Sequence, residues 1–536
     1  MTTETSRKPS GASSPIRLAT NFVTVGVWTF LSRVLGFARD IMMAAYLGTG
    51  PVAEAFAVAF TLPNMFRRFF AEGAFNLAFV PMFAKKLEAG EDATGFARDA
   101  YAGMAFILTI FSVIGMLIMP VLVWLMASGW VGDARFSLAT AYARVTFPYI
   151  LLISLTALLS GILNAAGRFR AAAAAPALLN LTFIPAIVIG AHFDALPGGG
   201  DGVRIGWAMA WGLPVAGILQ LATLWWAARR AGFTMTIKRP RLTPELRQLA
   251  IIAMPAVLAG GVVQINLLVG RQVASYFEGA YNWLSYADRL YQLPLGVVGA
   301  AIGVVLLPEL SRRLAAGDDK AGKQAMNRAT EFALMLSVPA AVALVVIAVP
   351  LISVMYERGA FTSADTAATA LALAVYGLGL PAFVMQKVLQ PLFYARADTR
   401  SPFRFALVSL VVNAVAAVAL APFIGFIAAA VGTTVAGWGM VLQLWLGSRK
   451  MGAAAEVDAQ LRTRFWRICA AAAIMGVFLA IAYALLNPML EPGRMRYLAL
   501  MILVFGGMGV YFVAGQLLRA FDIREVRAML RRSKGR

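Results

Sequence analysis

Several arginines interrupt the longest apolar stretches of this sequence. Arg33, Arg39 and Arg67 lie in the first stretches, and Arg289 lies in a later one. A charged side chain at the centre of a bilayer costs about 2.5 to 3.5 kcal/mol on insertion scales, so these groups must face water, a carboxylate or an anionic ligand. A guanidinium group stays charged and binds phosphate oxygens through two parallel hydrogen bonds. The arginines therefore predict a cavity for an anionic substrate, and a diphosphate would suit them.

Carboxylates in or at the ends of the same stretches could neutralise part of this charge. The candidates are Asp40, Glu54, Glu72, Glu278 and Asp288. The further cations are Arg68, Arg144, Arg271 and Lys387. Because cations outnumber carboxylates, pairing alone does not neutralise the set. Snorkelling or structural ion pairing is the competing interpretation, which we favour for Arg144 and Lys387 and leave open for Arg68.

Polar residues at helical spacing extend the predicted cavity in the second half of the chain. One stripe holds Gln264, Arg271 and Ser275, and a second holds Ser285, Arg289 and Gln292. Residues four and seven positions apart share one face of a helix, so each stripe could line a cavity. A polar seam between two packed helices would give the same pattern.

The elements that must hold these residues are membrane-spanning helices. The chain has 536 residues, of which 60% are hydrophobic and 14% charged, and its mean hydropathy is +0.75. A water-soluble protein could not carry this composition on its surface. About 14 apolar segments have the roughly 20 residues that a hydrocarbon core about 30 Å thick requires. We expect an all-α integral membrane protein with about 14 transmembrane helices.

The basic residues predict the orientation of these helices. The net charge is +21, with 47 lysines and arginines. About 34 of them fall in tails and linkers on one side, which the positive-inside rule places in the cytoplasm together with both termini. About five fall on the outward side, namely Arg135, Arg204, Arg358, Arg494 and Arg496. Because the charge follows topology, nucleic-acid binding is disfavoured as its explanation.

An internal repeat indicates two lobes. Residues 74–90 read AFNLAFVPMFAKKLEAG and align without a gap with residues 301–317, which read AIGVVLLPELSRRLAAG. The offset of about 230 residues corresponds to six spans, so the two units have the same orientation, as in transporters with a site between their repeats. We expect two pseudo-symmetric six-helix lobes around a central cavity, plus two C-terminal helices. Chance similarity of helices rich in small residues is the alternative.

The predicted organisation follows from these boundaries. It comprises a disordered cytoplasmic tail at 1–16, an N-terminal lobe at 17–230, a cytoplasmic linker at 231–246, a C-terminal lobe at 247–448, a second cytoplasmic linker at 449–465, two further spans at 466–518 and a basic cytoplasmic tail at 519–536.

Catalytic and cofactor chemistry finds little support. Cys469 is the only cysteine and His192 the only histidine, which excludes disulfides, multi-thiolate metal sites and Cys–His catalysis within one chain. The glycines at 198–200 lack a following phosphate-binding lysine, so a P-loop is excluded. We expect a transporter rather than an enzyme, without a cofactor or a metal, and with any energy supplied by gradients.

Two long motifs carry a resemblance to a known family. They are SRxLGFxRD at 32–40 and LPNxxRRxxAEGAFxxAFVP at 62–81, both within residues 29–83. This region resembles the opening spans of the MurJ (MviN) lipid II flippases. The resemblance continues in TFPYILLISLTALLSGILNAAGRF, SYADRLYQLPLGVVGAAIGVVLLPELS and KVLQPLFYARADTRSP, so it covers essentially the whole chain.

The resemblance implies a fold and a function. The fold is that of the multidrug/oligosaccharidyl-lipid/polysaccharide exporters, with two C-terminal helices that form a groove for a polyprenyl tail. The implied function is to flip lipid II, the undecaprenyl-diphosphate-linked peptidoglycan precursor, outward across the bacterial inner membrane by alternating access, driven by membrane potential or an ion gradient. Lipid II, membrane lipids and a functional link to the cell-wall synthesis machinery are the implied partners of a monomeric protein.

The resemblance also implies site residues. Substrate-binding positions are Arg33, Arg39, Arg67 and Arg289. Supporting positions that the resemblance implies are Ser32, Gly36, Glu54, Asn64 and Glu72. The charge pattern and the polar stripes add Asp40, Arg68, Arg271, Asp288 and Gln292 as cavity or ion-pair positions. Gln292 stands where some relatives carry a carboxylate, so an acid there cannot be essential to the mechanism. Ala172 stands where some relatives carry proline, which puts a helix break there in doubt. Asn413, Thr433 and Thr434 come without a carboxylate, so a sodium site there has weak support.

Four other functions remain open. A flippase for another polyprenyl-linked oligosaccharide would use the same chemistry. A drug or cation antiporter of the same fold would need a cavity dominated by carboxylates rather than arginines. A membrane enzyme acting on lipid-linked glycans would need an outward acid or histidine, and a non-transporting scaffold would tolerate loss of Arg33 and Arg289.

Overall fold

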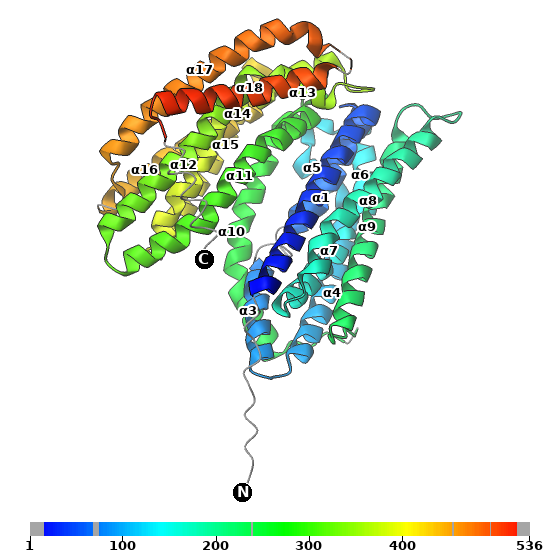
Figure 1. Cartoon of the computed structure of the whole chain (residues 1–536). Helices are drawn as coiled ribbons and strands as arrows, with labels where there is room; N and C mark the ends of the chain where they lie inside the picture. The colour runs from blue at the N-terminus through cyan, green and yellow to red at the C-terminus, as the bar shows by residue number, and fades with distance from the viewer. Residues whose placement is uncertain are drawn as a thin grey trace. The chain divides into compact units, whose positions relative to one another are not determined.

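The computed structural model describes residues 15–67, 74–236, 239–452, 455–491, 493 and 495–521. Within these ranges every regular element is a helix (Figure 1). The expectation of an all-α protein is therefore confirmed for the part of the chain that the structure describes.

The helices fall in chain order. The first half contains α1 (Pro15–Leu47), α2 (Pro51–Arg67), α3 (Ala74–Glu88), α4 (Ala93–Leu117), α5 (Met119–Met126), η2 (Ser128–Trp130), α6 (Ala134–Thr146), α7 (Tyr149–Ala165), α8 (Phe169–Asp194) and α9 (Val203–Arg230). The second half contains α10 (Pro244–Ala274), α11 (Ala280–Ala315), α12 (Asp319–Val346), α13 (Ala348–Tyr356), α14 (Ser363–Tyr394), α15 (Arg400–Ile424), η3 (Gly425–Ile427), α16 (Ala428–Ser448), η4 (Arg449–Met451), α17 (Ala459–Leu490) and α18 (Met495–Leu517).

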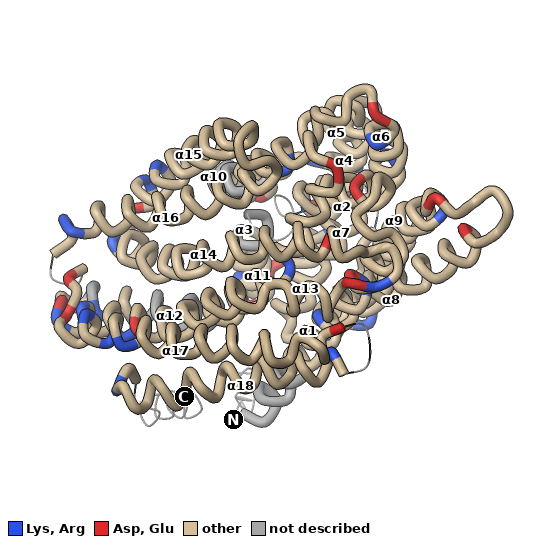
Figure 2. Tube along the Cα trace, turned by 90° about the horizontal axis from the view of Figure 1, so that it is seen from above, with Lys and Arg blue, Asp and Glu red and all other residues tan. Residues whose placement is uncertain are grey.

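Nine helical stretches in the described ranges are long and apolar enough to cross a membrane. They include α4, α8, α9, α12, α14, α17 and α18, and two composite stretches formed by α6 with α7 and by α15 with α16. Figure 2 shows α12, α14, α16 and α17 free of charged residues along most of their length, with Lys and Arg gathered at one end. This distribution is that of a multi-pass membrane protein.

Side-chain caps set the starts of several helices. Asp92 precedes α4 and accepts a hydrogen bond from the Gly95 amide at 2.7 Å. Asp458 accepts one from the Leu461 amide at the start of α17. Thr362 and Asp365 form a reciprocal capping box at the start of α14. Each cap satisfies backbone amides that have no partner inside the helix, and so fixes where the helix begins.

The chain divides into two compact units. Unit 1 comprises Met1–Met42, Ala59–Met119 and Ala141–Gly260, and unit 2 comprises Met43–Val58, Pro120–Thr140 and Gly261–Arg536. Within unit 1, α7 and α8 pack against α9, and α3, α4 and α7 bury a cluster of aromatic and aliphatic side chains that includes Phe79, Phe83 and Phe96. Within unit 2, α12, α13, α17 and α18 bury a second cluster that includes Met475, Leu503 and Tyr511.

Two turns of unit 2 meet so closely that both need glycine. The Ala360 amide donates to the Ala45 carbonyl at 2.8 Å. A Cβ on Gly359 would lie 2.1 Å from the Ala45 carbonyl oxygen, and a Cβ on Gly48 would lie 2.4 Å from the Ala360 carbonyl oxygen. Both glycines also have positive φ, which other residues adopt at a cost. The chain just after α1 is thereby fixed to the turn before α14.

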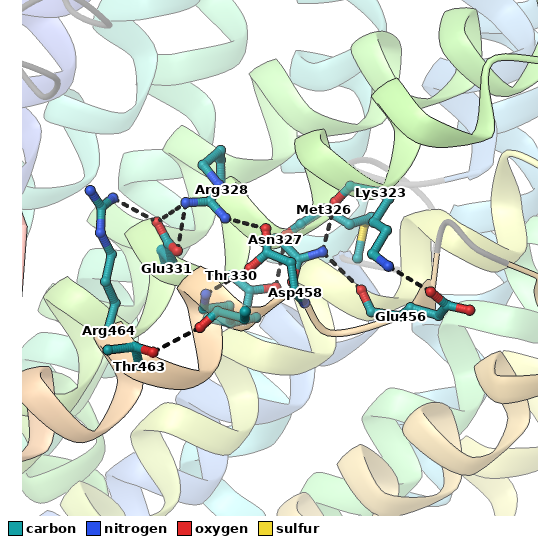
Figure 3. A network of polar contacts seen from close by, with 12 residues as sticks. Lys323, Met326, Asn327, Arg328, Thr330, Glu331, Glu456, Asp458, Thr463 and Arg464 are labelled. Carbon is teal, nitrogen blue, oxygen red and sulfur yellow. Dashed lines mark hydrogen bonds and ion pairs between the residues drawn. The ribbon is translucent and has the colours of Figure 1, made fainter.

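Ion pairs join α17 to α12 (Figure 3). Oε2 of Glu331 on α12 accepts from Arg328 at 2.8 Å and from Arg464 on α17 at 3.0 Å. Arg328 also pairs with Asp458, the residue that caps α17. Asn327 donates to the Glu456 carbonyl at 2.9 Å and accepts from the Asp458 amide at 3.0 Å. These contacts fix the start of α17, and with it the C-terminal helix pair, against α12.

Candidate functional site

Arg39 on α1 is buried and paired within unit 1. Only 5% of the residue is exposed, and its Nη2 lies 2.7 Å from Oδ1 of Asp40. The guanidinium lies 5.5 Å from the centre of the Phe60 ring and 5.8 Å from that of Phe183. Aromatic faces and an adjacent carboxylate both stabilise a buried cation. Arg39 is therefore already compensated, unlike a cation that is free for a ligand.

Arg33 lies on the same helix but, unlike Arg39, it is neither buried nor paired with a described residue. Its side chain is exposed, and no other described residue forms a hydrogen bond or ion pair with it. The neighbouring face of α1 packs on α8, where Asn180 Nδ2 donates to the Ser32 carbonyl at 3.0 Å. A Cβ on Gly36 would lie 3.4 Å from that nitrogen, so a residue without a side chain admits Asn180 most easily. Arg33 thus stands as an uncompensated cation on a firmly packed helix.

Pro63 explains how the end of α2 is held. A proline has no amide hydrogen, so the carbonyl four residues earlier, that of Ala59, loses its helical donor. The Thr146 hydroxyl donates to the Ala59 carbonyl at 2.8 Å and replaces it. One residue after Pro63, Asn64 Nδ2 donates to the Phe60 carbonyl at 2.8 Å. Arg67 is the last residue of α2 and is half-buried, so this repaired turn positions it.

Two predicted positions, Arg68 and Glu72, lie outside the described residues. Their predicted roles remain predictions from the sequence.

Glu54 is the centre of a buried polar cluster in unit 2. Its side chain is fully buried, its Oε2 lies 2.8 Å from Nη1 of Arg135, and its Oε1 accepts from the Tyr281 amide at 3.3 Å. Arg135 also bonds Asp133, with 2.6 Å between Nη2 and Oδ2, and lies 5.4 Å from the centre of the Trp130 ring. The hydrogen bond from Arg135 lowers the pKa of the Asp133 carboxyl below its ordinary value. Glu54 therefore holds three segments of unit 2 together through an ion pair.

The two predicted stripes of unit 2 have different partners. On the first, the Arg271 guanidinium lies 4.4 Å from the centre of the Tyr281 ring, and the Ser275 hydroxyl accepts from the Gly129 amide at 3.0 Å. On the second, Ser285 donates to the Tyr281 carbonyl at 2.7 Å. The first stripe is thus partly a packing seam, as the competing interpretation allows.

Arg289 is an exposed member of the second stripe. Its neighbours on α11 are Asp288, which is half-buried, and Gln292, which is exposed and donates to Oδ2 of Asp288. An amide at position 292 therefore does what a carboxylate could not, because it donates to an acid one turn away.

The predicted site residues are distributed over both units. Unit 1 contains Ser32, Arg33, Gly36, Arg39, Asp40, Asn64 and Arg67, and unit 2 contains Glu54, Arg271, Asp288, Arg289 and Gln292. Within the units, the structure pairs Arg39 with Asp40 and Gln292 with Asp288.

Sequence reasoning missed the partner of Glu54 and the role of Asn180. Arg135 was expected only as one of the few outward cations, yet it lies against a carboxylate 81 residues earlier. No local pattern encodes such a contact. The spacing between Pro148 and Asn180, which repeats between Pro381 and Asn413, was a usable signal that Asn180 occupies a structurally equivalent position in its repeat.

The polar residues of the weakly supported sodium site are engaged with protein groups. Asn413 Nδ2 donates to Asn266 Oδ1 at 2.8 Å, Thr433 donates to the Ala429 carbonyl at 2.9 Å, and Thr434 donates to the Val375 carbonyl at 3.0 Å. Among the described residues, no group of three or more His, Cys, Asp or Glu side chains could hold a metal ion.

Comparison with known sequences identifies relatives over nearly the whole chain. The family model described as "Lipid II flippase MurJ" matches residues 43–504. A probable lipid II flippase MurJ from Rhizobium tropici is 42% identical over 526 residues, which cover 96% of this chain and 97% of the relative. One from Rhizobium meliloti (strain 1021) is 44% identical over 502 residues, which cover 92% and 93%.

Comparison with solved structures agrees with the sequence relatives. A lipid II flippase MurJ in an inward closed conformation matches with a TM-score of 0.75 and 26% identity, over 92% of this chain and 98% of that chain. An inward-facing MATE family multidrug resistance transporter of the MOP superfamily matches with a TM-score of 0.59 and 14% identity, over 84% and 97%. At that identity the second match concerns the fold alone.

Proposed function

This chain belongs to the lipid II flippase MurJ family, and we propose that it translocates lipid II from the cytoplasmic to the periplasmic leaflet of the bacterial inner membrane. The protein is a transporter: no bond in the substrate is made or broken. The observation that carries the proposal beyond family membership is Arg33, an exposed cation on an apolar helix that no described residue compensates.

The substrate chemistry fits these cations. A diphosphate carries oxygens that guanidinium groups bind in bidentate geometry. We assign direct head-group binding to Arg33, Arg67 and Arg289. Arg39 supports them as a member of the cavity wall, because Asp40 and two aromatic rings already stabilise its charge. We also include Arg68 and Glu72 in the proposed site on the basis of the sequence, because the structure does not describe them.

The proposed mechanism is alternating access. Two six-helix lobes, 17–230 and 247–448, rock about a central cavity, while spans at 466–518 hold the polyprenyl tail in lipid. About 14 spans place both termini in the cytoplasm, as the basic linkers indicate. The head group binds the arginines from the cytoplasmic side and leaves on the periplasmic side. We infer that the protein works as a monomer and supplies the cell-wall synthesis machinery.

The membrane potential is a sufficient source of energy for an anionic cargo. With a negative interior, outward movement of an anion is downhill by about 2.3 kcal/mol per charge per 100 mV. Return of unliganded arginines offsets part of this drive. An ion gradient is the alternative source.

A second candidate substrate is another polyprenyl-linked oligosaccharide. It carries the same diphosphate, so the arginines alone do not discriminate against it. The relatives described as probable lipid II flippases favour lipid II. A cation antiporter is disfavoured because Arg33 and Arg289 present positive charge.

Depletion of the protein in growing cells tests the proposal. An enzyme that cleaves lipid II is added from outside, and the protected fraction of lipid II is measured. We expect protected lipid II to accumulate, and to become cleavable when the wild-type protein is restored but not when Arg289→Ala is restored. Lipid II that stays fully cleavable during depletion would exclude it as the cargo.

A further inference from the structure

Two arginines converge where α13 ends and α18 begins, both within unit 2. Arg358 follows α13, and its Nη2 donates to the Val354 carbonyl at 2.7 Å and to the Met355 carbonyl at 2.9 Å. Arg496 is the second residue of α18, and its Nη1 donates to the Glu357 carbonyl at 3.1 Å. The Arg496 guanidinium also lies 5.3 Å from the centre of the Tyr497 ring. Two positive charges therefore share one small region.

No carboxylate in the described part of the chain compensates these charges. Among the described residues, none forms an ion pair with Arg358 or Arg496, and the nearby Glu357 carboxylate accepts from the Thr366 hydroxyl at 2.8 Å instead. Arg496 is only 8% exposed. Burial of a cation without a counter-charge is strongly unfavourable, so this arrangement calls for an anion.

Unsatisfied donors give a second, independent indication. The Nε atoms of both Arg358 and Arg496 are buried and have no hydrogen-bond partner. Buried N–H groups in native proteins are paired in the great majority of cases, and an exception points to a bound water or ion. A ligand that draws the two guanidinium groups toward itself would satisfy donors that backbone carbonyls leave unpaired.

A purely structural role explains Arg358 better than Arg496. Arg358 lies at the carboxyl end of α13, where a cation stabilises the helix by capping its last carbonyls. Arg496 lies in the first turn of α18, where the helix dipole is positive and a cation is unfavourable. The same helix start attracts anions through its free amides. Helix capping therefore does not explain why a cation stands at position 496.

The surroundings indicate which anion. The site lies where α18 packs on α13 (Figure 1), at the end of the helices that the charge distribution predicts to face outward. Tyr497 is 44% exposed beside it, so the site is open at its edge. Tyrosines of this kind mark the boundary between lipid and water, where lipid head groups lie. We propose that Arg358, Arg496 and the amino end of α18 bind the phosphate of a lipid head group in the outward leaflet.

This site contains none of the arginines that we propose to bind the head group, and its existence does not depend on the identity of the cargo. Two lipids supply the required chemistry. One is an anionic phospholipid of the outward leaflet, and the other is a polyprenyl diphosphate that has reached that leaflet.

Binding to the purified full-length protein tests the proposal. The protein is placed in nanodiscs of phosphatidylcholine, and phosphatidylglycerol, undecaprenyl diphosphate or inorganic phosphate is added separately. Native mass spectrometry reports bound lipid, and the shift of the unfolding temperature reports stabilisation, because a ligand that binds the folded state raises it. We expect at least one of the two lipids to bind, with affinity about tenfold weaker in Arg496→Gln.

Arg204→Gln is the matched control. Arg204 is another predicted outward arginine, and it donates to the Phe193 carbonyl at 2.6 Å and the Pro197 carbonyl at 3.3 Å, without a second guanidinium beside it. Like Arg358 and Arg496 it donates to backbone carbonyls, but it lacks the second cation, so its substitution should leave lipid binding unchanged. Arg496→Lys keeps the charge and should retain part of the affinity, which guards against misfolding of the glutamine variant.

Each outcome decides the proposal. Preference for phosphatidylglycerol or for undecaprenyl diphosphate supports it and identifies the lipid. Equal lipid binding by the wild type, Arg496→Gln and Arg204→Gln would overturn it. Inorganic phosphate that binds as tightly as both lipids would overturn the assignment to a lipid.

Discussion

The Glu54 carboxylate lies 2.8 Å from the guanidinium of Arg135 and is completely shielded from solvent. The pair joins a residue in the first turn of α2 to one in the first turn of α6, and the Tyr281 amide at the start of α11 also donates to Glu54. Three segments distant in the sequence therefore depend on one carboxylate.

Removal of that carboxylate should destabilise the protein. Breaking a buried ion pair from one side costs about 3 to 5 kcal/mol when the remaining charge has no partner, and Arg135 would keep only the partly exposed Asp133. We expect Glu54→Ala to lower the unfolding temperature in detergent far more than Asp133→Ala, because Asp133 is partly exposed. A double variant with Arg135→Ala should recover part of the loss, since no charge is then left buried. Additive losses in the double variant would show that the two residues are not coupled.

The Thr146 hydroxyl should matter because of Pro63. Thr146→Val removes the donor that replaces the missing proline amide at the Ala59 carbonyl, and a lost hydrogen bond of this kind costs about 0.5 to 1.5 kcal/mol. Arg67 lies one helical turn beyond Pro63, so we expect a parallel decrease in the flipping rate. Thr140→Val is the control, because its hydroxyl bonds only the Phe136 carbonyl of its own helix. Equal effects of the two substitutions would contradict the role given to Thr146.

Alanine substitutions at Gly359 and Gly132 distinguish the cost of a close contact from the cost of an unfavourable backbone conformation. Both have positive φ, 58° and 86°, so alanine at either position costs about 1 kcal/mol in conformational strain. A Cβ on Gly359 would also overlap the Ala45 carbonyl, whereas nothing lies within 4 Å of one on Gly132. Overpacking adds about 1 to 3 kcal/mol. Thermal unfolding should therefore rank Gly359→Ala well below Gly132→Ala, and similar unfolding temperatures would refute the contact.

The Glu331 cluster should control how firmly α17 is held. Glu331→Gln weakens the shared acceptor of Arg328 and Arg464, so amide hydrogen exchange at the first turns of α17 should become faster. Glu456→Gln is the control, since its pair with Lys323 is exposed and contributes little. Unchanged exchange in Glu331→Gln, or an equal change in both variants, would count against the proposed anchoring.

More of the fold than of the candidate site could be predicted from the sequence. The all-helical membrane architecture follows from apolar runs of the length that a bilayer requires, which is a local property of sequence. The excess of arginine over carboxylate was equally visible in the sequence, and it predicted a binding role for Arg33, which stays a prediction. The surroundings of Arg39 were not foreseeable, because the rings of Phe60 and Phe183 reach it only after α2 and α8 have packed. Contacts such as Glu54 with Arg135 depend on tertiary structure in the same way.

The type of cation at position 33 tests bidentate recognition. Arg33→Ala should reduce lipid II flipping by at least about tenfold, since an ion pair to phosphate is lost. Arg33→Lys should also be impaired, because an ammonium group cannot form the two parallel hydrogen bonds of a guanidinium. Flipping rates of both variants, compared at equal protein levels, measure this. Full activity of Arg33→Lys would show that charge alone suffices.

Transport by the purified chain tests the central claim most directly. The protein is reconstituted into liposomes that carry fluorescent lipid II, or a fluorescent polyprenyl-diphosphate oligosaccharide of different sugar composition, and the fraction reached by a membrane-impermeant quencher is followed over time. We predict that lipid II exchanges between leaflets in the presence of the wild-type protein and much more slowly with Arg33→Ala. Absence of exchange for lipid II, with exchange of the other oligosaccharide lipid, would contradict the assignment of lipid II as the cargo.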